Sequence, residues 1–182
     1  SLGNDGSISL ENLKNCINND LANNFGNLCQ RVFSFIEKNC NSKIPSPNKF
    51  NNEDKKLLNN LVKKLPKLKE LMENQELNLY IKEVINFSFD SNKYFNDLEP
   101  WNLKKSNLDR MNTVLYCVLN QIKSISILLY PIIPTSIEKI FKTMGLKKED
   151  IILNNVKNLN LLKPETSVKK GDILFKKIEN DN

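Results

Sequence analysis

The sequence predicts a mostly α-helical protein, folded as a bundle of about five helices with a short extended segment near its C-terminus. Over long stretches, apolar residues recur every three or four positions, which places them on one face of an α-helix. Glycine is scarce, at 5 of 182 residues, while leucine, isoleucine, lysine and asparagine abound, and this favours helices over a sandwich of short strands. A chain of this length can bury a core as one domain, with or without a small appendage.

Composition excludes several kinds of chemistry. The chain has no histidine, which excludes Ser-His and Cys-His nucleophilic sites and histidine-bound metals. Its four cysteines form no C-x-x-C pair, so we expect no metal site and interpret them as small apolar groups in a reducing compartment. With no apolar run long enough to cross a bilayer and no signal peptide, we expect a cytoplasmic protein without membrane contact.

The charge balance suggests the class of partner. The net charge of +6 points toward a polyanion, although a charge of this size could also serve solubility alone.

Three parts are expected along the chain: a lead-in segment over 1–8, a helical bundle over 9–145 and a C-terminal appendage over 146–182. The appendage would pack on the bundle or on a domain outside this chain. Within it, Gly171 and Asp172 predict a turn, and Ile173 to Ile178 an extended segment. The chain begins on serine rather than methionine, so we expect it to be a piece of a larger protein.

The first helix is predicted from Ser9, a fair N-cap, to about Asn39. Its apolar stripe comprises Ile17, Leu21, Phe25, Leu28, Val32 and Phe35. A lysine-rich helix should follow over 51–73, kinked or split by Pro66, with its lysines on a solvated face.

The remaining helices are predicted from the same spacing. A third helix over 76–95 should bury Leu79, Val84, Ile85 and Phe87. After a polar connection over 97–105, Ser106 and Asp109 resemble a capping box for a fourth helix, which must end before Pro131 and should turn Leu108 inward.

Two further signals concern the second half of the chain. We expect Arg110 to pair with an acid of a neighbouring helix. A last helix should begin at Pro134 and end at Met144, closed by Gly145.

Asn27 and Arg31 are the first candidate site residues. They lie four residues apart, so their side chains share a helix face outside the apolar stripe. An amide offers a donor and an acceptor, and a guanidinium offers several donors in a flat fork, so the pair could read the edge of an unstacked base and hold its phosphate. This stretch by itself favours the alternative that both are ordinary solvated helix residues. Arg31 and Arg110 are the only arginines in the chain, which favours a need for the planar group at these positions.

Trp101, the only tryptophan, follows Pro100 in the polar connection. It is either a packed core residue or an exposed platform on which a base can stack. Lys104 and Lys105 follow within a turn and could contact backbone phosphates. An aromatic platform, nearby lysines and an Asn–Arg pair are together what recognition of a single-stranded RNA loop requires.

Four segments of the chain resemble, in the same order, the C-terminal anticodon-binding domain of methionyl-tRNA synthetase. The first is Asp20–Asn23 and Gly26–Leu28 with Arg31, and the second is Tyr94–Phe95, Glu99–Trp101 and Leu103–Lys105. The third is Tyr130–Pro134 running into Ser136 and Ile140, and the last is Gly171 through Ile173–Phe175 with Ile178 and Glu179. The resemblance covers nearly the whole chain, and Asn27 with Arg31 and Pro100 with Trp101 are its specific parts.

The resemblance implies a helical bundle of the class I synthetase type, behind a Rossmann-type catalytic domain of the same protein. It also implies that Asn27, Arg31 and Trp101 read a CAU anticodon, with Pro100 shaping the tryptophan loop. The parent enzyme would use ATP and Mg²⁺ to attach methionine to its tRNA. No catalytic signature of that family occurs in this chain, so we expect no catalytic residue and no cofactor here.

Some positions depart from the pattern, and other readings stay open. Asn96 stands where the family commonly has an acid, and Lys176 with Lys177 replaces its usual Pro-Arg. The chain could instead be the same module of another class I aminoacyl-tRNA synthetase. It could also be a non-enzymatic helical module that binds proteins or RNA.

Overall fold

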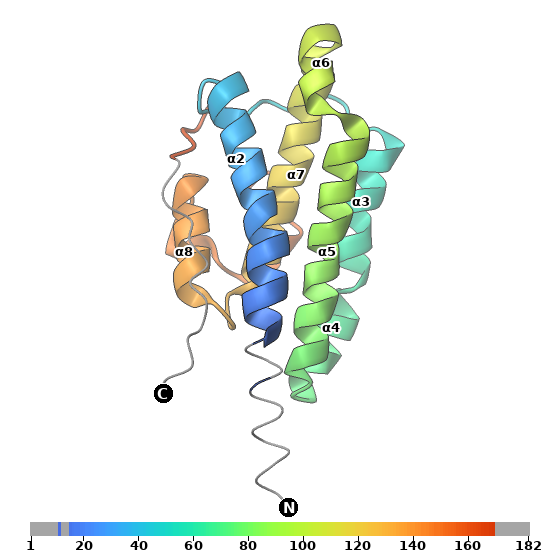
Figure 1. Ribbon diagram of the computed structural model, residues 1–182, viewed down its shortest axis with the longest axis vertical. Coiled ribbons are helices and arrows are strands. Elements are labelled where there is room, and N and C mark those ends of the chain that lie inside the picture. The colour runs from blue at the N-terminus through green and yellow to red at the C-terminus, as the bar shows by residue number, and fades with distance from the viewer. Residues whose placement is uncertain (1–10, 12–14, 170–182) are drawn as a thin grey trace, which may run out of the picture.

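The computed structural model describes residue 11 and residues 15–169, and these form a helical bundle (Figure 1). In chain order its elements are η1 (Cys16–Gly26), α2 (Asn27–Asn39), α3 (Asn52–Lys63), α4 (Leu65–Glu73), α5 (Leu77–Leu98), α6 (Pro100–Ser106), α7 (Leu108–Leu129), α8 (Pro134–Thr143), η2 (Lys148–Asp150) and η3 (Leu153–Val156). The predicted helical class is confirmed. Ser9 and the segment Ile173–Ile178 lie outside the described residues.

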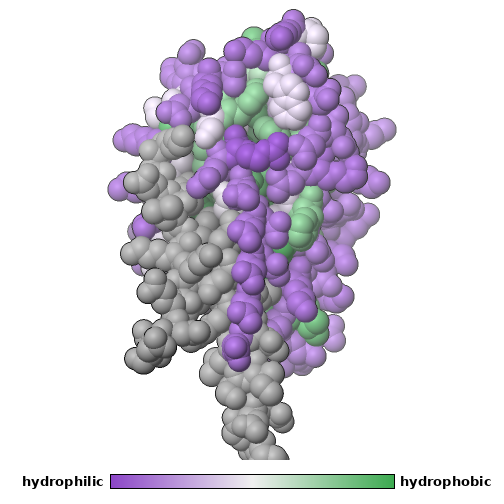
Figure 2. Space-filling view, in the orientation of Figure 1, coloured by the Kyte–Doolittle hydropathy of each residue, from purple (hydrophilic) through white to green (hydrophobic). Residues whose placement is uncertain are grey.

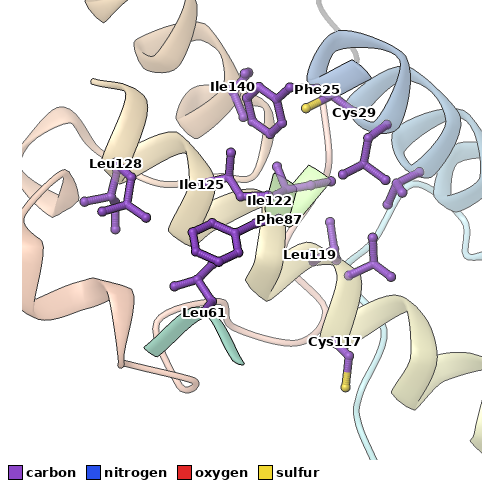
Figure 3. Packing of buried hydrophobic residues seen from close by; sticks show 14 of the residues in the cluster. Phe25, Cys29, Leu61, Phe87, Cys117, Leu119, Ile122, Ile125, Leu128 and Ile140 are labelled. Atoms are coloured by element: carbon purple, nitrogen blue, oxygen red, sulfur yellow. The ribbon is translucent and has the colours of Figure 1, made fainter. Parts of the chain in front are cut away.

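Helix α7 is the centre of the bundle. Every residue from 113 to 129 is buried, and α2, α3, α5 and α8 all pack against this helix. Figure 3 shows Leu119, Ile122 and Ile125 of α7 among side chains of the surrounding elements. By length and composition α7 could also cross a membrane, but 94% of its apolar window is buried inside the bundle, which accounts for its hydropathy.

The first predicted helix is continuous but changes geometry along its length. Cys16–Gly26 is a wide π-helix, and α-helical hydrogen bonding begins at Asn27. The π segment is rich in asparagine and ends on glycine, both weak α-helix formers, whereas α2 is richer in strong ones. Leu21, Phe25, Leu28 and Val32 are buried as predicted, and Phe35 is half-buried.

Pro66 divides the lysine-rich helix as predicted: α3 ends at Lys63 and α4 starts at Leu65, with proline in its first turn. The helix α8 also follows the prediction, because Pro134 opens it. Just beyond α8, Gly145 adopts φ +72° in contact with Thr166, a conformation and a space that favour glycine.

The region between α5 and α7 corrects three predictions. Residues 97–105 are not an irregular connection, because α5 runs to Leu98 and Pro100–Ser106 forms α6. The N-cap of α7 is Asn107 rather than Ser106, and its side chain accepts from the Arg110 N–H at 3.1 Å. Leu79 and Leu108, expected inside, are 49% and 55% exposed, whereas Tyr80, Ile81 and Met111 beside them are buried, so the two leucines lie on outward faces of α5 and α7.

Residues after α8 lie against the bundle without a long helix. The buried Lys123 ammonium of α7 donates to the carbonyls of Asn155, Val156 and Asn158 at 2.7, 3.2 and 2.8 Å. Lys43 and Ser167 form an isolated antiparallel bridge. The division of the chain at residue 145 stays a prediction.

Candidate nucleic-acid interface

Helix α6 follows α5 at the upper end of the bundle in Figure 1, and α2 packs beside α5. Glu99 joins α5 to α6 with φ +46°, in the left-handed region, so the chain changes direction within one residue. Pro100 then occupies the first helical position and is buried. The short helix therefore holds Trp101 at a defined place on the bundle.

Trp101 combines the two alternatives that the sequence left open. Its side chain is 40% exposed, so a large part of the indole faces solvent. The rest contacts the ring of Phe95 edge-on, with centroids 5.9 Å apart and ring planes inclined by 61°. Because part of Trp101 packs on Phe95 while part is accessible to solvent, its ring is available for stacking.

Arg31 is held by two side chains of α5. Its Nη1 donates to Asn92 Oδ1 at 3.1 Å, and its Nη2 donates to Asn96 Oδ1 at 2.7 Å. The guanidinium carbon also lies 4.9 Å from the centroid of the Phe95 ring, a cation–π contact. Among the described residues, no carboxylate forms an ion pair with Arg31. The side chain is therefore fixed in place while its positive charge stays uncompensated.

Phe95 joins the two predicted residues. It is 3% exposed, and its ring contacts Arg31, Trp101 and the edge of Phe35 of α2, whose centroid is 6.1 Å away. The resemblance included Phe95 in a family segment, but the sequence did not indicate that it contacts both Arg31 and Trp101. The one feature of the sequence that could have indicated this role is an aromatic residue five positions before Pro100.

Asn27 is exposed at the start of α2, one turn before Arg31. In the part of the chain that the structure describes, its amide side chain makes no hydrogen bond. The predicted face shared with Arg31 is present, but no contact within the chain fixes the orientation of Asn27.

The two lysines differ. Lys104 donates to Asn39 Oδ1 at 2.7 Å, which ties α6 to the end of α2 through a neutral partner, so its charge is retained. Burial raises the pKa of Cys40 beside it, and the Lys104 charge opposes that rise. Lys105 is exposed. Both ammonium groups lie in the same helix as Trp101, where a strand stacked on the indole could reach them.

Outside the grey residues, the face seen in Figure 2 is mostly hydrophilic, with apolar and intermediate side chains near the α6 end and further apolar ones lower on the right. A polar surface around a few aromatic groups suits a solvated ligand such as single-stranded RNA. The described residues contain no group of three or more His, Cys, Asp or Glu that could hold a metal.

Comparison with known proteins identifies the family of this chain. A family model described as the anticodon binding domain of methionyl tRNA ligase matches residues 44–182. The chain belongs to this family. The methionine–tRNA ligase of Thermotoga maritima is 34% identical over 178 residues, which make up 97% of this chain and 28% of that protein.

Solved structures of methionyl-tRNA synthetase have the same fold. The apo enzyme of Mycobacterium tuberculosis has a TM-score of 0.81 and 29% identity over 92% of this chain and 34% of that chain. The same enzyme in complex with methionyl-adenylate has a TM-score of 0.78, over 85% of this chain and 31% of that chain. The chain thus spans about a third of the length of these relatives.

The resemblance to the methionyl-tRNA synthetase family is confirmed, and none of these matches favours another synthetase or a separate interaction module. The family model begins at residue 44 and so excludes Asn27 and Arg31. The match to the Thermotoga maritima enzyme covers 97% of the chain and so includes the segment that forms α2.

Proposed function

We propose that this chain binds methionine-accepting tRNA and recognises its CAU anticodon, as the C-terminal part of a methionine–tRNA ligase. The observation that carries the proposal is the cluster in which Phe95 contacts both Arg31 and Trp101, with Asn27 one turn away on the same helix. The family match supports the same reading.

Each residue has a defined role in the proposal. Trp101 supplies a face on which an unstacked anticodon base stacks, worth about 1–3 kcal/mol. Asn27 and Arg31 offer hydrogen-bond donors and an acceptor to base edges beside it, and Arg31 adds a charge that attracts the backbone. Pro100 fixes the start of α6, and Lys104 and Lys105 neutralise phosphates.

The catalytic part of the proposed activity lies outside this chain. We infer a parent enzyme that activates methionine with ATP and Mg²⁺, since one related structure contains methionyl-adenylate. The partners would be this tRNA and a catalytic domain of the same protein, in the cytoplasm. The 182-residue chain alone should therefore support no methionine-dependent ATP–pyrophosphate exchange, and exchange above background would contradict this.

The direct test is binding of the chain to RNA stem-loops that carry CAU or a single altered anticodon base. The fluorescence of Trp101 reports on RNA binding, because Trp101 is the only tryptophan in the chain. We expect the CAU loop to bind most tightly and to quench the indole emission. Equal affinity for every loop, or an emission indifferent to RNA, would contradict anticodon recognition.

Salt dependence tests the lysines. For a single strand, the slope of log affinity against log salt should be about −0.7 for each neutralised phosphate. Lys105→Ala should reduce the slope by about one such contact. Lys139→Ala, a change of an exposed lysine on α8, should leave it unaltered. The same slope in both variants would remove Lys105 from the interface.

A further inference from the structure

Lys123 is a charged residue inside the core. It lies in the middle of α7, and its side chain is fully buried. Its ammonium donates to the backbone carbonyls of Asn155, Val156 and Asn158 at 2.7, 3.2 and 2.8 Å. In the part of the chain that the structure describes, no carboxylate forms an ion pair with this ammonium. Backbone dipoles, rather than an acid, therefore stabilise the buried charge.

The three carbonyls belong to an irregular segment, η3 and the two residues after it. Their oxygens converge on one point, each within 3.2 Å of it. Because oxygen is the negative end of a carbonyl, such oxygens repel one another unless a cation or several donors lie between them. Clustered backbone carbonyls are ligands for monovalent cations such as K⁺, and a cluster of neutral oxygens disfavours a divalent ion. The arrangement is therefore that of a cation site whose occupant belongs to the chain.

Two neighbours of the lysine on α7 bind the same segment. Ser124 donates to one of the three carbonyls at 2.9 Å. The Tyr116 hydroxyl lies 2.8 and 2.7 Å from the carbonyl oxygens of Leu159 and Leu162. Tyr116 is seven residues before the lysine, about two turns, so the three side chains share one face of α7. We call residues 153–162 the strap, and α7 binds the strap through its backbone oxygens.

We propose that the strap carbonyls form a binding site for a monovalent cation, that the Lys123 ammonium fills this site, and that the filled site fastens the strap to the bundle. The inference goes beyond the proposed function and does not depend on RNA binding. Without the ammonium, the three oxygens would remain in the core with no donor from the lysine, and the strap should separate from α7. The helices should stay packed, because their apolar side chains hold them together.

The same site should accept a free cation. If the lysine is shortened to alanine, the carbonyls remain, and space for the lost ammonium opens between them and α7. An ammonium ion has the charge and the N–H donors of the lost group, so it should enter this space and restore the attachment. Tetramethylammonium has the same charge but no N–H donor, and it is much larger, so it should not.

The test measures hydrogen–deuterium exchange of backbone amides in the full 182-residue chain. Amides of the strap are compared with amides of α5. Lys123→Met keeps an apolar stem of similar length but removes the charge and the donors, and Lys123→Ala leaves room for a free ion. Ser124→Ala is the matched control, because it removes a neutral donor to one of the same carbonyls.

The pH of the measurement keeps the lysine charged. Burial lowers the pKa of Lys123 to about 7, whereas the accepting carbonyls favour its charged form. At about pH 6 the amine of the unaltered chain is therefore protonated.

Exchange in the strap of Lys123→Met should be at least about tenfold faster than in the unaltered chain, because hydrogen bonds from a charged donor are lost. Exchange in α5 should be unchanged, and Ser124→Ala should accelerate exchange in the strap less. In Lys123→Ala, ammonium chloride should restore slow exchange, and the same concentration of tetramethylammonium chloride should not. Neither salt should slow exchange in the unaltered chain, because its site is filled.

Each contrary result overturns a stated part of the proposal. If exchange in the strap of Lys123→Met stays within about twofold of the unaltered chain, no cation is needed there. If this variant loses protection equally in α5, or does not fold, the lysine supports the whole core and the strap is not fastened separately. In that case Lys123→Ala, refolded with each salt, still tests the cation site. If ammonium and tetramethylammonium act alike on Lys123→Ala, the carbonyls form no cation site.

Discussion

The two arginines of this chain occupy opposite kinds of environment. The Arg110 side chain on α7 is 14% exposed, and its Nη1 and Nη2 bind both oxygens of the fully buried Asp54 at 2.6 and 2.8 Å, while Nη2 also binds Glu53 at 3.0 Å. Arg31 is exposed and is held by two neutral amides and an aromatic face. One charge is neutralised inside the molecule and the other is available to a ligand.

Asp54 explains why the buried arginine is structural. Its carboxylate accepts from the Asn51 N–H in the capping box of α3, from Tyr94 of α5 and from Arg110 of α7. Burial alone would raise the pKa of Asp54, but these hydrogen bonds and the Arg110 charge lower it below its ordinary value. Desolvation and the Asp54 hydrogen bond also raise the pKa of the Tyr94 hydroxyl. Three helices thus meet at one ion pair, as predicted for Arg110.

The comparison teaches that the partners of a charge indicate its use better than its residue type does. A bidentate carboxylate compensates a guanidinium and removes it from solvent. Amides orient a guanidinium without compensating it. Arg31 and Arg110 should therefore respond differently to the same substitution.

The largest expected effect is on stability. Arg110→Met should lower the free energy of unfolding by about 3–5 kcal/mol, because it leaves the Asp54 carboxylate buried without its partner. Arg31→Met, the matched control, should cost about 1 kcal/mol or less, since its partners remain in contact with water. Urea unfolding of both variants measures the difference.

Similar losses in the two methionine variants would contradict the assignment of Arg110 as the structural arginine. If Arg110→Met does not fold, the double variant with Asp54→Leu provides the test. Removing both charges should restore part of the stability, but not the part contributed by the α3 cap.

The next effect is on binding rather than folding. Trp101→Ala should weaken binding of the CAU stem-loop by about 1–3 kcal/mol, because the stacking face is lost. The bundle should stay folded, since Trp101 is 40% exposed and packs on Phe95 at the edge of the core. Trp101→Phe should recover much of the affinity. An alanine variant that unfolds readily, with indole emission in the unaltered chain insensitive to RNA, would make Trp101 structural.

A smaller effect is expected in discrimination. Arg31→Lys keeps the charge but loses the planar fork that Asn92, Asn96 and Phe95 orient. The preference for CAU over altered anticodons should fall by about 1 kcal/mol, more than the overall affinity falls. Competition binding between stem-loops measures this ratio. Equal losses for all loops would show that Arg31 only attracts phosphate.

The smallest expected effect is on the free energy of unfolding at low pH. Because the pKa of Asp54 is lower in the folded chain than in the unfolded chain, its ionisation stabilises the fold above the ordinary carboxyl pKa. That contribution should be lost as the pH falls from about 4 through the folded value of this group. Asp54→Asn should flatten this part of the profile of unfolding free energy against pH. An unaltered slope in Asp54→Asn would assign the acid sensitivity to other carboxyls.

Local sequence determined much of the fold. The apolar spacing predicted the helices, Pro66 predicted the break between α3 and α4, and Pro134 with Gly145 predicted the limits of α8. These features depend on residues within one or two turns of each other, where periodicity, proline and glycine act directly on the backbone. Asn27 and Arg31 were placed on one face by the same local rule.

Only the tertiary structure decided how the candidate site is assembled. The residues that hold Arg31 lie 61 and 65 positions away along the chain, so no local pattern could pair them. The exposed fraction of Trp101 depends on how α6 packs beside Phe95, and the partner of Arg110 depends on which acid α3 turns inward. The sequence by itself determined which side chains carry suitable chemistry. The packing of α2, α5, α6 and α7 decided which of them meet, because contact between distant residues is set by the whole bundle.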